Sequence, residues 1–284
     1  MTISVHTNKS ALTALHNLNR SSDKLTEVQG RISTGLKVNG AKDNPSTWAV
    51  AQKQRADIGA IQAVKTSLDR AQSVGDVALA AGESISDLLN EIKAKVTLAM
   101  DPSISPESRS AINNDFRALL RQIADTVENA EFDGANILNG SLSTAIKFLS
   151  NADADKYIDL TPINLTFGSS NGLTLLAADG LTASTATASV ALATSVMTRV
   201  QSSISQVNGL LSGLGSELKQ IEAHNKFIAK LTDVLDAGVG NLVDADLAKE
   251  SARLQALQVQ QQLGTQALSI ANQAPQVILS LFRS

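Results

Sequence analysis

The chain has 284 residues, of which 43% are hydrophobic and only 3% aromatic, and its formal net charge is -3. Burial must therefore come from Ala, Leu, Ile and Val, which favours long packed helices over the core of a globular enzyme. The small net charge and the scattered Lys and Arg residues argue against nucleic acid as a partner. Cysteine is absent, which excludes disulfides, thiol catalysis and cysteine-ligated metals.

The amino-terminal residues MTISVHTNKSALTALHNL lack the basic and apolar regions of a signal peptide. No run in the chain approaches the ~18 apolar residues that a membrane-spanning helix needs. Neither classical secretion nor membrane anchoring is expected.

The first predicted element is a helix from Ala11 to Gly35, where glycine is a natural helix end. Its apolar residues recur at coiled-coil spacing, and they are Ala11, Ala14, Leu18, Leu25, Val28 and Ile32. In the stretch that follows, Asn39-Gly40 predicts a turn, and Asn44 before Pro45 predicts the start of a new helix.

The second helix should be long, because two apolar series repeat every seven residues. They are Ile61, Leu68, Gly75, Gly82, Leu89 and Val96, and Val64, Ala71, Ala78, Ile85, Ile92 and Ala99. We interpret the two glycines as positions of close helix packing rather than as phosphate-binding glycines.

Asp101-Pro102 interrupts this pattern, and Ser105-Pro106-Glu107 predicts the start of a third helix that turns back beside the second. Its apolar residues are Ile112, Phe116, Leu119, Ile123, Val127 and Ala130.

The period changes after Gly134. Residues 146–167, IKFLSNADADKYIDLTPINLTF, alternate over short runs broken by Asn, Asp and Pro, which predicts one or two small β-hairpins. Residues 168–189 are mostly small and polar, and we expect a loop there. Asp153 and Asp155 could belong to a calcium loop, but the other ligands are missing and a solvated turn is the preferred interpretation.

Helix is predicted again from about Val190 to Ala237-Gly238. Its heptad series is Val200, Val207, Leu214, Ile221, Ile228 and Leu235, with Ile204, Leu211 and Leu218 beside it.

The last segment, from Asp244 to Ser284, carries two apolar seams on adjacent helix faces. The first is Leu247, Leu254, Leu257, Leu268, Ala271, Ile278 and Phe282, and the second is Leu263, Ala267, Ile270, Ala274, Val277 and Leu281. One partner helix cannot cover both seams. Periodicity alone also fits a helix buried in an ordinary core, but the many glutamines favour a subunit interface.

The expected fold class is mainly α: a long antiparallel coiled-coil bundle with a small β-hairpin region, folded double so that the N- and C-terminal helices pair. We expect residues 1–44 and 243–284 to form a terminal coiled-coil core domain. Residues 45–242 should form a helical bundle domain whose β-rich tip covers residues 136–185, approximately.

Four stretches of sequence are similar to motifs of one known family. They are GRISTGLKVNGAKDNPSTWAVAQ at 30–52, FDGANILNGS at 132–141 with FLSNADADKYIDL at 148–160, and QQQLGTQALSIANQAPQVILSL at 260–281. Together they resemble bacterial flagellin. The run NPSTW departs from the family's small residues at that place, and the short central stretch resembles a minimal flagellin with only the inner domains.

The resemblance implies a structural subunit that polymerises into the extracellular filament of the bacterial flagellum, for swimming motility, and implies no enzyme activity. The alternative is a hook-filament junction protein or another exported coiled-coil filament component. Implied partners are further copies of the chain, an export chaperone, the filament cap and the hook-junction proteins, with no nucleic acid and no membrane insertion. The expected polymerisation interface includes Leu18, Leu25, Ile32, Leu254, Leu257, Leu263, Leu268, Ile270, Ile278 and Leu281.

No catalytic, cofactor-binding or metal site is predicted. His6, His16 and His224 are dispersed and form no metal-ligand spacing with a carboxylate. An enzyme is therefore a poor alternative, and so is a membrane-active toxin, because no apolar span is present.

Many flagellins carry, on the first long helix, a segment similar to LQRVRELAV, which an innate immune receptor of vertebrates binds. The corresponding run here is LNEIKAKVT at residues 89–97. Glu91 stands where the family has arginine, and Lys95 where it has leucine. We predict that these two altered positions oppose receptor binding.

Overall fold

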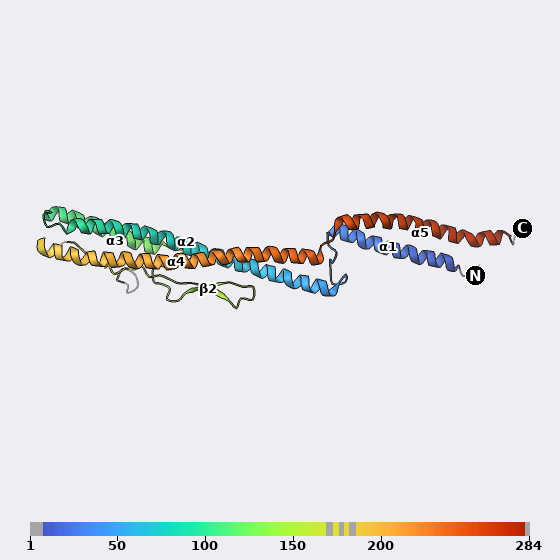
Figure 1. Cartoon of the computed structure of the whole chain (residues 1–284), viewed down its shortest axis with the longest axis horizontal. Coiled ribbons are helices and arrows are strands. Elements are labelled where there is room, and N and C mark those ends of the chain that lie inside the picture. The colour runs from blue at the N-terminus through green and yellow to red at the C-terminus, as the bar shows by residue number, and fades with distance from the viewer. Residues whose placement is uncertain (1–7, 169–172, 176–178, 182–185, 282–284) are drawn as a thin grey trace. The chain divides into compact units, whose positions relative to one another are not determined.

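The computed structural model describes residues 8–168, 173–175, 179–181 and 186–281 (Figure 1). Side chains are described from Ala188 onward in the fourth helix and as far as Gln273 in the fifth. In chain order the elements are α1 (Lys9–Thr34), α2 (Pro45–Ala99), α3 (Pro106–Asn129), β1 (Ile146–Leu149), β2 (Tyr157–Leu160), α4 (Ala186–Val243) and α5 (Leu247–Leu281). The expected class, mainly α with a small hairpin, is confirmed.

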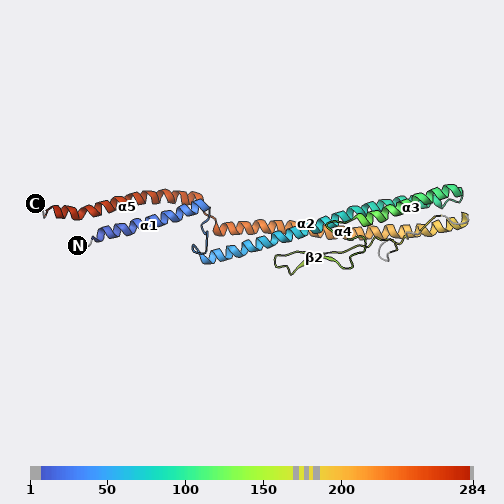
Figure 2. The same cartoon turned by 180° about the vertical axis from the view of Figure 1, so that it is seen from behind.

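The chain forms two compact units. The terminal unit comprises Met1–Asp57 and Asp233–Ser284, and the central unit comprises Ile58–Thr232. Within the terminal unit, α1 and α5 lie side by side in both views (Figures 1 and 2). The expected pairing of the two terminal helices is therefore confirmed.

Local sequence explains the helix ends. Asn8, Asn44 and Ser105 cap α1, α2 and α3, because each side chain accepts a hydrogen bond from the backbone N–H three residues later, at 3.1, 3.1 and 3.2 Å. These bonds satisfy N–H groups that a helix leaves unpaired at its start. Gly35 ends α1 in the left-handed region, with φ of 72°. The predicted starts of α2 and α3 and the predicted end of α1 are confirmed. Helix α1 begins at Lys9, two residues before the predicted Ala11.

A buried arginine caps the C-terminal end of α2. Arg109 of α3 is only 3% exposed, and its guanidinium donates hydrogen bonds to the carbonyl oxygens of Ala99 and Asp101, the second at 2.8 Å. Those carbonyls have no partner within the helix. Arg109 therefore stabilises the turn between α2 and α3.

The core of the central unit consists of the predicted heptad residues. Residues of α2, α3 and α4 with no exposed surface include Leu68, Ala71, Ile85, Leu89, Ile92, Val96, Phe116, Ile123, Val200, Val207 and Ile221. Such a seam stabilises the unit because each side chain removes apolar surface from water. On α3, Ile112 is the one predicted seam residue that stays partly exposed among those named for this helix.

Two glycines let α2 and α4 approach closely. A Cβ atom at Gly75 would lie 2.2 Å from Cδ2 of Leu218, and one at Gly82 would lie 2.3 Å from Cδ2 of Leu211. Each leucine thus occupies the place that a side chain would take. The interpretation of these glycines as packing positions is confirmed.

The predicted hairpin is present, with β1 antiparallel to β2 and Ile146 opposite Leu160. Helix side chains hold it in place. Ser67 of α2 accepts a hydrogen bond from the end of β1 at 3.2 Å, and Glu217 of α4 accepts one from the residue after β2 at 2.9 Å. Nε2 of His224 lies 2.7 Å from the carbonyl oxygen of the residue after β1. His224 is therefore a docking residue of the hairpin.

The expected polar loop over 168–189 can be compared with the structure only in part, because residues 169–172, 176–178 and 182–185 lie outside the described residues. The described residues before α4 are irregular, as expected, but two details of the expectation are wrong. Leu173, Leu175 and Leu181 are completely buried, and α4 already begins at Ala186. The segment is fastened to the helices, since Asn113 of α3 accepts a hydrogen bond from the backbone of Leu181 at 2.8 Å. These leucines cover the helices as an irregular layer rather than pointing to solvent.

The expected helix end at Ala237-Gly238 is also wrong. Helix α4 continues to Val243, because Val239 and Val243 are buried and a helical glycine is tolerated when packing compensates its propensity. Helix α5 begins after Asp246, whose side chain accepts hydrogen bonds from the backbone N–H groups at its start. Over their described residues, the helices include none that is long and apolar enough to cross a membrane.

Candidate assembly surface

An inward seam holds α1 and α5 together in the terminal unit. Its members are less exposed than their neighbours: Ala11, Ala14, Leu18, Ser21, Leu25, Val28 and Ile32 on α1, and Glu250, Leu254, Leu257, Gln261, Gly264, Leu268 and Ala271 on α5. Six of the residues that we expected at an interface between subunits therefore lie between two helices of one chain. Leu247 is not in this seam, because it is 50% exposed.

A second set of apolar residues faces outward from the same helix pair. On α5, Leu263 is 64% exposed and Ile270 is 63% exposed, with Val259 on the same helix. On α1, Leu12 and Leu15 are 49% and 42% exposed. We call these five residues the outward apolar set. So much exposed apolar surface on one small unit is typical of a protein-protein contact.

The remaining expected interface residues fall at the end of α5. The backbone of α5 is helical to Leu281, but the side chains of Ile278 and Leu281 lie outside the described residues, as does Phe282.

A groove of about 940 Å³ runs between the two terminal helices. Its lining includes Lys9, Arg20 and Lys24 from α1, and Gln260, Leu263 and Gly264 from α5. One wall is thus basic, while α5 has no ionisable side chain from Leu254 to Leu281. The two helices therefore offer chemically different surfaces.

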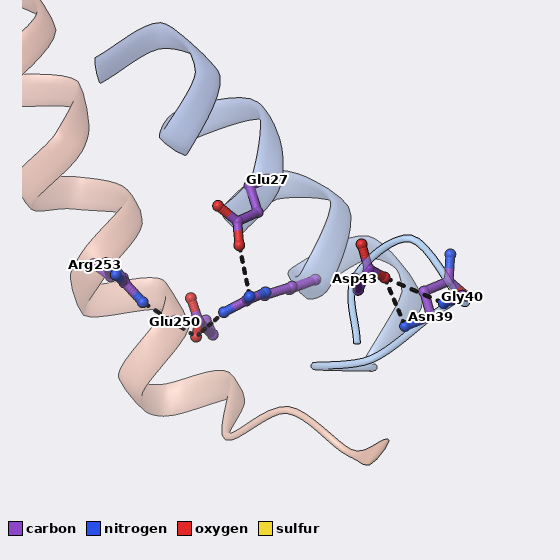
Figure 3. Close-up of polar contacts among 7 residues, drawn as sticks. Glu27, Asn39, Gly40, Asp43, Glu250 and Arg253 are labelled. Atoms are coloured by element: carbon purple, nitrogen blue, oxygen red, sulfur yellow. Dashed lines mark hydrogen bonds and ion pairs between the residues drawn. The ribbon is translucent and has the colours of Figure 1, made fainter. Parts of the chain in front are cut away.

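An ion-pair cluster lies at the base of the helix pair, formed by Glu27 and Arg31 of α1 and Glu250 and Arg253 of α5 (Figure 3). Arg31 Nη2 lies 2.6 Å from Glu27, and its Nη1 lies 3.4 Å from Glu250 Oε1. Arg253 is farther from Glu250, at 3.9 Å. The Glu250 side chain is only 9% exposed, so this carboxylate sits within the seam, and Arg31 is the nearer of its two charge partners.

The linkers that enter and leave the terminal helices meet beside this cluster. Leu36 and Asp244 form an antiparallel bridge, and the backbone N–H of Lys37 donates to the carbonyl oxygen of Val243 at 2.7 Å. The bridge joins the end of α1 to the start of α5.

Asp43 holds the turn in the first linker. Its carboxylate accepts hydrogen bonds from the backbone N–H groups of Asn39 and Gly40, at 3.0 and 3.2 Å (Figure 3). The turn predicted at Asn39-Gly40 is confirmed.

Comparison with known proteins identifies the family. Residues 5–143 match the bacterial flagellin N-terminal helical region, and residues 197–282 match the bacterial flagellin C-terminal helical region. Flagellin FljM of Caulobacter vibrioides is 47% identical over 280 residues, covering 99% of this chain and 98% of that protein. A flagellin of Brucella melitensis is 36% identical over 282 residues, covering 99% of both chains. The chain belongs to the bacterial flagellin family.

Like its relatives, this flagellin is a structural protein and not an enzyme. Its copies polymerise into the extracellular filament of the bacterial flagellum. A solved structure of a flagellar hook-associated protein from Vibrio parahaemolyticus aligns with a TM-score of 0.58 at 12% identity, over 71% of this chain and 100% of that one. That likeness shows a shared fold alone.

The two altered positions of this flagellin lie on α2 in the central unit. Glu91 is exposed, and Lys95 Nζ lies 2.8 Å from a carboxylate oxygen of Asp115 on α3. The hydrogen bond to Asp115 and its charge raise the pKa of Lys95 above its ordinary value. Lys95 is therefore a charged side chain that is already engaged with α3.

Sequence reasoning missed Arg31 and Glu250. Glu250 stands four residues before Leu254 and seven before Leu257, so its seam position was visible in the spacing. A charged residue at a coiled-coil seam position indicates a contact that determines how the two helices pair. Among the residues that the structure describes in this flagellin, no group of three or more His, Asp or Glu side chains could hold a metal ion.

Proposed function

We propose that the outward apolar set makes the contacts between flagellin subunits, whereas the inward seam holds α1 to α5 within each subunit. The observation that carries this proposal is the exposure of Leu263 and Ile270, 64% and 63%, on a helix whose opposite face is already covered by α1. Leaving that apolar surface in water is unfavourable, by roughly 25 cal/mol for each Å².

The surfaces of α1 and α5 differ, which suits the contact that a filament needs. Helix α1 carries Lys9, Arg20 and Lys24 on its side of the groove, whereas α5 has no ionisable side chain from Leu254 to Leu281. A surface that binds a different surface on the next copy gives a contact that does not close, and such a contact grows a helical tube.

The assignment of the expected interface residues follows from this division. Leu263 and Ile270 contact neighbouring subunits. Ile278 and Leu281, whose side chains lie outside the described residues, remain expected members of the same interface. The inward residues act indirectly, by shaping the helix pair that presents those contacts; they are Leu18, Leu25, Ile32, Leu254, Leu257 and Leu268.

The domain roles belong to the same proposal. Residues 1–44 and 243–284 would form the core of the tube and residues 45–242 its outer wall. The presence of both chain ends in one compact unit supports this arrangement.

The test is Leu263→Glu, with Leu263→Met as the matched control. The added carboxylate would be buried without a partner in the filament yet solvated in the monomer. We expect Leu263→Glu to abolish seeded polymerisation, seen by electron microscopy, while the thermal unfolding of the monomer stays unchanged. Leu263→Met keeps volume and apolarity and should polymerise. Normal filaments from Leu263→Glu would remove this face from the subunit contact.

An export chaperone, the filament cap and the hook-junction proteins are proposed partners of the same face. Before polymerisation the outward apolar set has no cover from other subunits, and a chaperone that binds it would prevent aggregation. Binding of purified chaperone to monomer, measured by calorimetry, should weaken in Leu263→Glu and persist in Leu263→Met.

We also propose that Glu91 and Lys95 make this flagellin a poor ligand for the innate immune receptor. The exposed carboxylate of Glu91 has the opposite charge to the arginine of the family. The Lys95–Asp115 ion pair places charge where the family has an apolar leucine. Receptor signalling by purified monomer should be weak, and it should rise in Glu91→Arg/Lys95→Leu. The control Lys93→Leu changes an exposed lysine next to this pair and should leave signalling weak. Strong wild-type signalling, or no gain in the double variant, would refute the proposal.

A further inference from the structure

The inward seam of α1 and α5 repeats every seven residues, so its apolar layers alone fit more than one register. A slip of one heptad moves a helix by about 10.5 Å and again places seam residues opposite seam residues. In the observed register Leu18 lies against Gly264, and Arg31 lies against Glu250. These two contacts do not repeat along the seam.

The contact between Leu18 and Gly264 fills a gap that needs a large side chain from α1. A Cβ atom at Gly264 would lie 3.2 Å from Cδ1 and 3.8 Å from Cα of Leu18. If α1 slipped so that Ala11 faced Gly264, the gap would be left open, because alanine is too small to fill it. A void of this kind is destabilising.

The Arg31–Glu250 contact penalises the opposite slip. If Leu25 faced Gly264, the gap would be filled just as well as by Leu18, but Glu250 would pass the end of α1 and lose Arg31. Arg31 would then lie in the region of Leu257. This slip would break the Arg31–Glu250 pair, although Arg253 of the same helix would stay beside Glu250. It would also bring the charged guanidinium of Arg31 against the buried side chain of Leu257, which is unfavourable.

Neither contact is sufficient without the other. In the slip that places Ala11 at Gly264, Lys24 takes the position of Arg31 and can pair with Glu250. Only the unfilled gap then disfavours that slip. The glycine contact thus excludes one slip and the ion pair excludes the other.

We infer that these two contacts, Leu18 with Gly264 and Arg31 with Glu250, fix the register at which the terminal helices pair. The inference deepens the proposed division between inward seam and outward apolar set, since the register decides where Leu263 and Ile270 stand relative to Leu12 and Leu15. The bridge between Leu36 and Asp244 holds the base of the pair. The two side-chain contacts maintain the same register farther from the linkers.

The experiment uses the absence of native cysteine. Leu18→Cys/Gly264→Cys reports the observed register, because the Cβ atoms would lie 3.8 Å apart, the separation typical of a disulfide. Leu25→Cys/Gly264→Cys reports the slip that the ion pair excludes. Each reporter is placed in the wild-type background and in Arg31→Met/Glu250→Met, polymerised from seeds, oxidised and resolved on non-reducing gels.

We expect the 18–264 disulfide to dominate when the ion pair is intact. In Arg31→Met/Glu250→Met, the ratio of the 25–264 to the 18–264 disulfide should rise by at least about tenfold, as loss of a charged hydrogen bond predicts. The matched control, Lys226→Met/Glu222→Met, removes an exposed ion pair of the central unit and should leave the ratio unchanged. An unchanged ratio in Arg31→Met/Glu250→Met would overturn the inference and leave the register to other contacts, such as the backbone bridge and the hydrogen bond that Asn8 Nδ2 donates to the carbonyl oxygen of Ala271.

Variants that do not polymerise alone are copolymerised with an excess of wild-type subunits, so that the disulfides can still be measured. Electron microscopy separates the two questions. Loss of filaments in Leu263→Glu concerns the subunit contact, whereas a changed disulfide ratio within intact filaments concerns the register alone.

Discussion

Gly75 and Gly209 both stand inside long helices, but their surroundings differ. A Cβ atom at Gly75 would lie 2.2 Å from Leu218, whereas one at Gly209 would meet no atom within 4 Å. Glycine has low helix propensity at both positions. Only at Gly75 is this destabilisation offset, by close packing against Leu218. Substitution by alanine should therefore lower the free energy of unfolding at Gly75 and raise it at Gly209.

We expect Gly75→Ala to destabilise the central unit by about 1–3 kcal/mol, because the methyl group would overpack a seam in which Leu218 has little room to move. Gly209→Ala should instead stabilise it by about 0.5–1 kcal/mol through helix propensity. Thermal unfolding followed by circular dichroism measures both. Equal effects of the two substitutions would show that the contact with Leu218 is unimportant.

At the scale of elements, the periodic helices could be predicted and the aperiodic segment could not. Heptads recur over many turns, so each position in α2 or α4 is supported by several others. Leu173 and Leu175 have no such support, and what they cover is decided by helices distant in sequence. The inward seam was predicted only in part: Leu247 was wrongly included, and Ser21, Glu250, Gln261 and Gly264 were missed. A charged residue there was overlooked because charges are usually solvated.

Asn113 should be a key anchor of that aperiodic segment. It is buried, and it accepts a hydrogen bond from the backbone of Leu181 at 2.8 Å. Asn113→Ala would leave the buried N–H unpaired and should cost about 1–3 kcal/mol. The neighbouring Asn114→Ala is a matched control, because Asn114 is exposed. Similar unfolding temperatures for both variants would argue against this anchoring role.

For the whole molecule, the terminal and central units should differ in how far they depend on assembly. The central unit buries three helices and a hairpin around one core, whereas the pair formed by α1 and α5 leaves the outward apolar set in water. Two helices with one shared seam gain little burial against their conformational entropy. We predict that helices α1 and α5 are ordered in the filament and largely unfolded in the free monomer.

Limited trypsin digestion can check this difference. The terminal helices offer cleavage sites at Lys9, Arg20, Lys24, Arg31, Lys249 and Arg253. Mild digestion of monomer should cut these sites and spare residues 60–235, while filaments resist cutting at both ends. Equal protection of the ends in monomer and filament would contradict the prediction.

The meeting of Gly75 with Leu218 and of Gly82 with Leu211 also has a kinetic consequence. Each contact joins residues more than one hundred positions apart, so closing the α2–α4 seam requires a very long loop. Contacts of such separation slow folding, because chain entropy is lost before the contacts form. During synthesis, α2 leaves the ribosome long before α4. The apolar residues of α2 that pack against α4 therefore stay uncovered until α4 has been made. We therefore expect the central unit to fold late and in one step, once most of the chain is available.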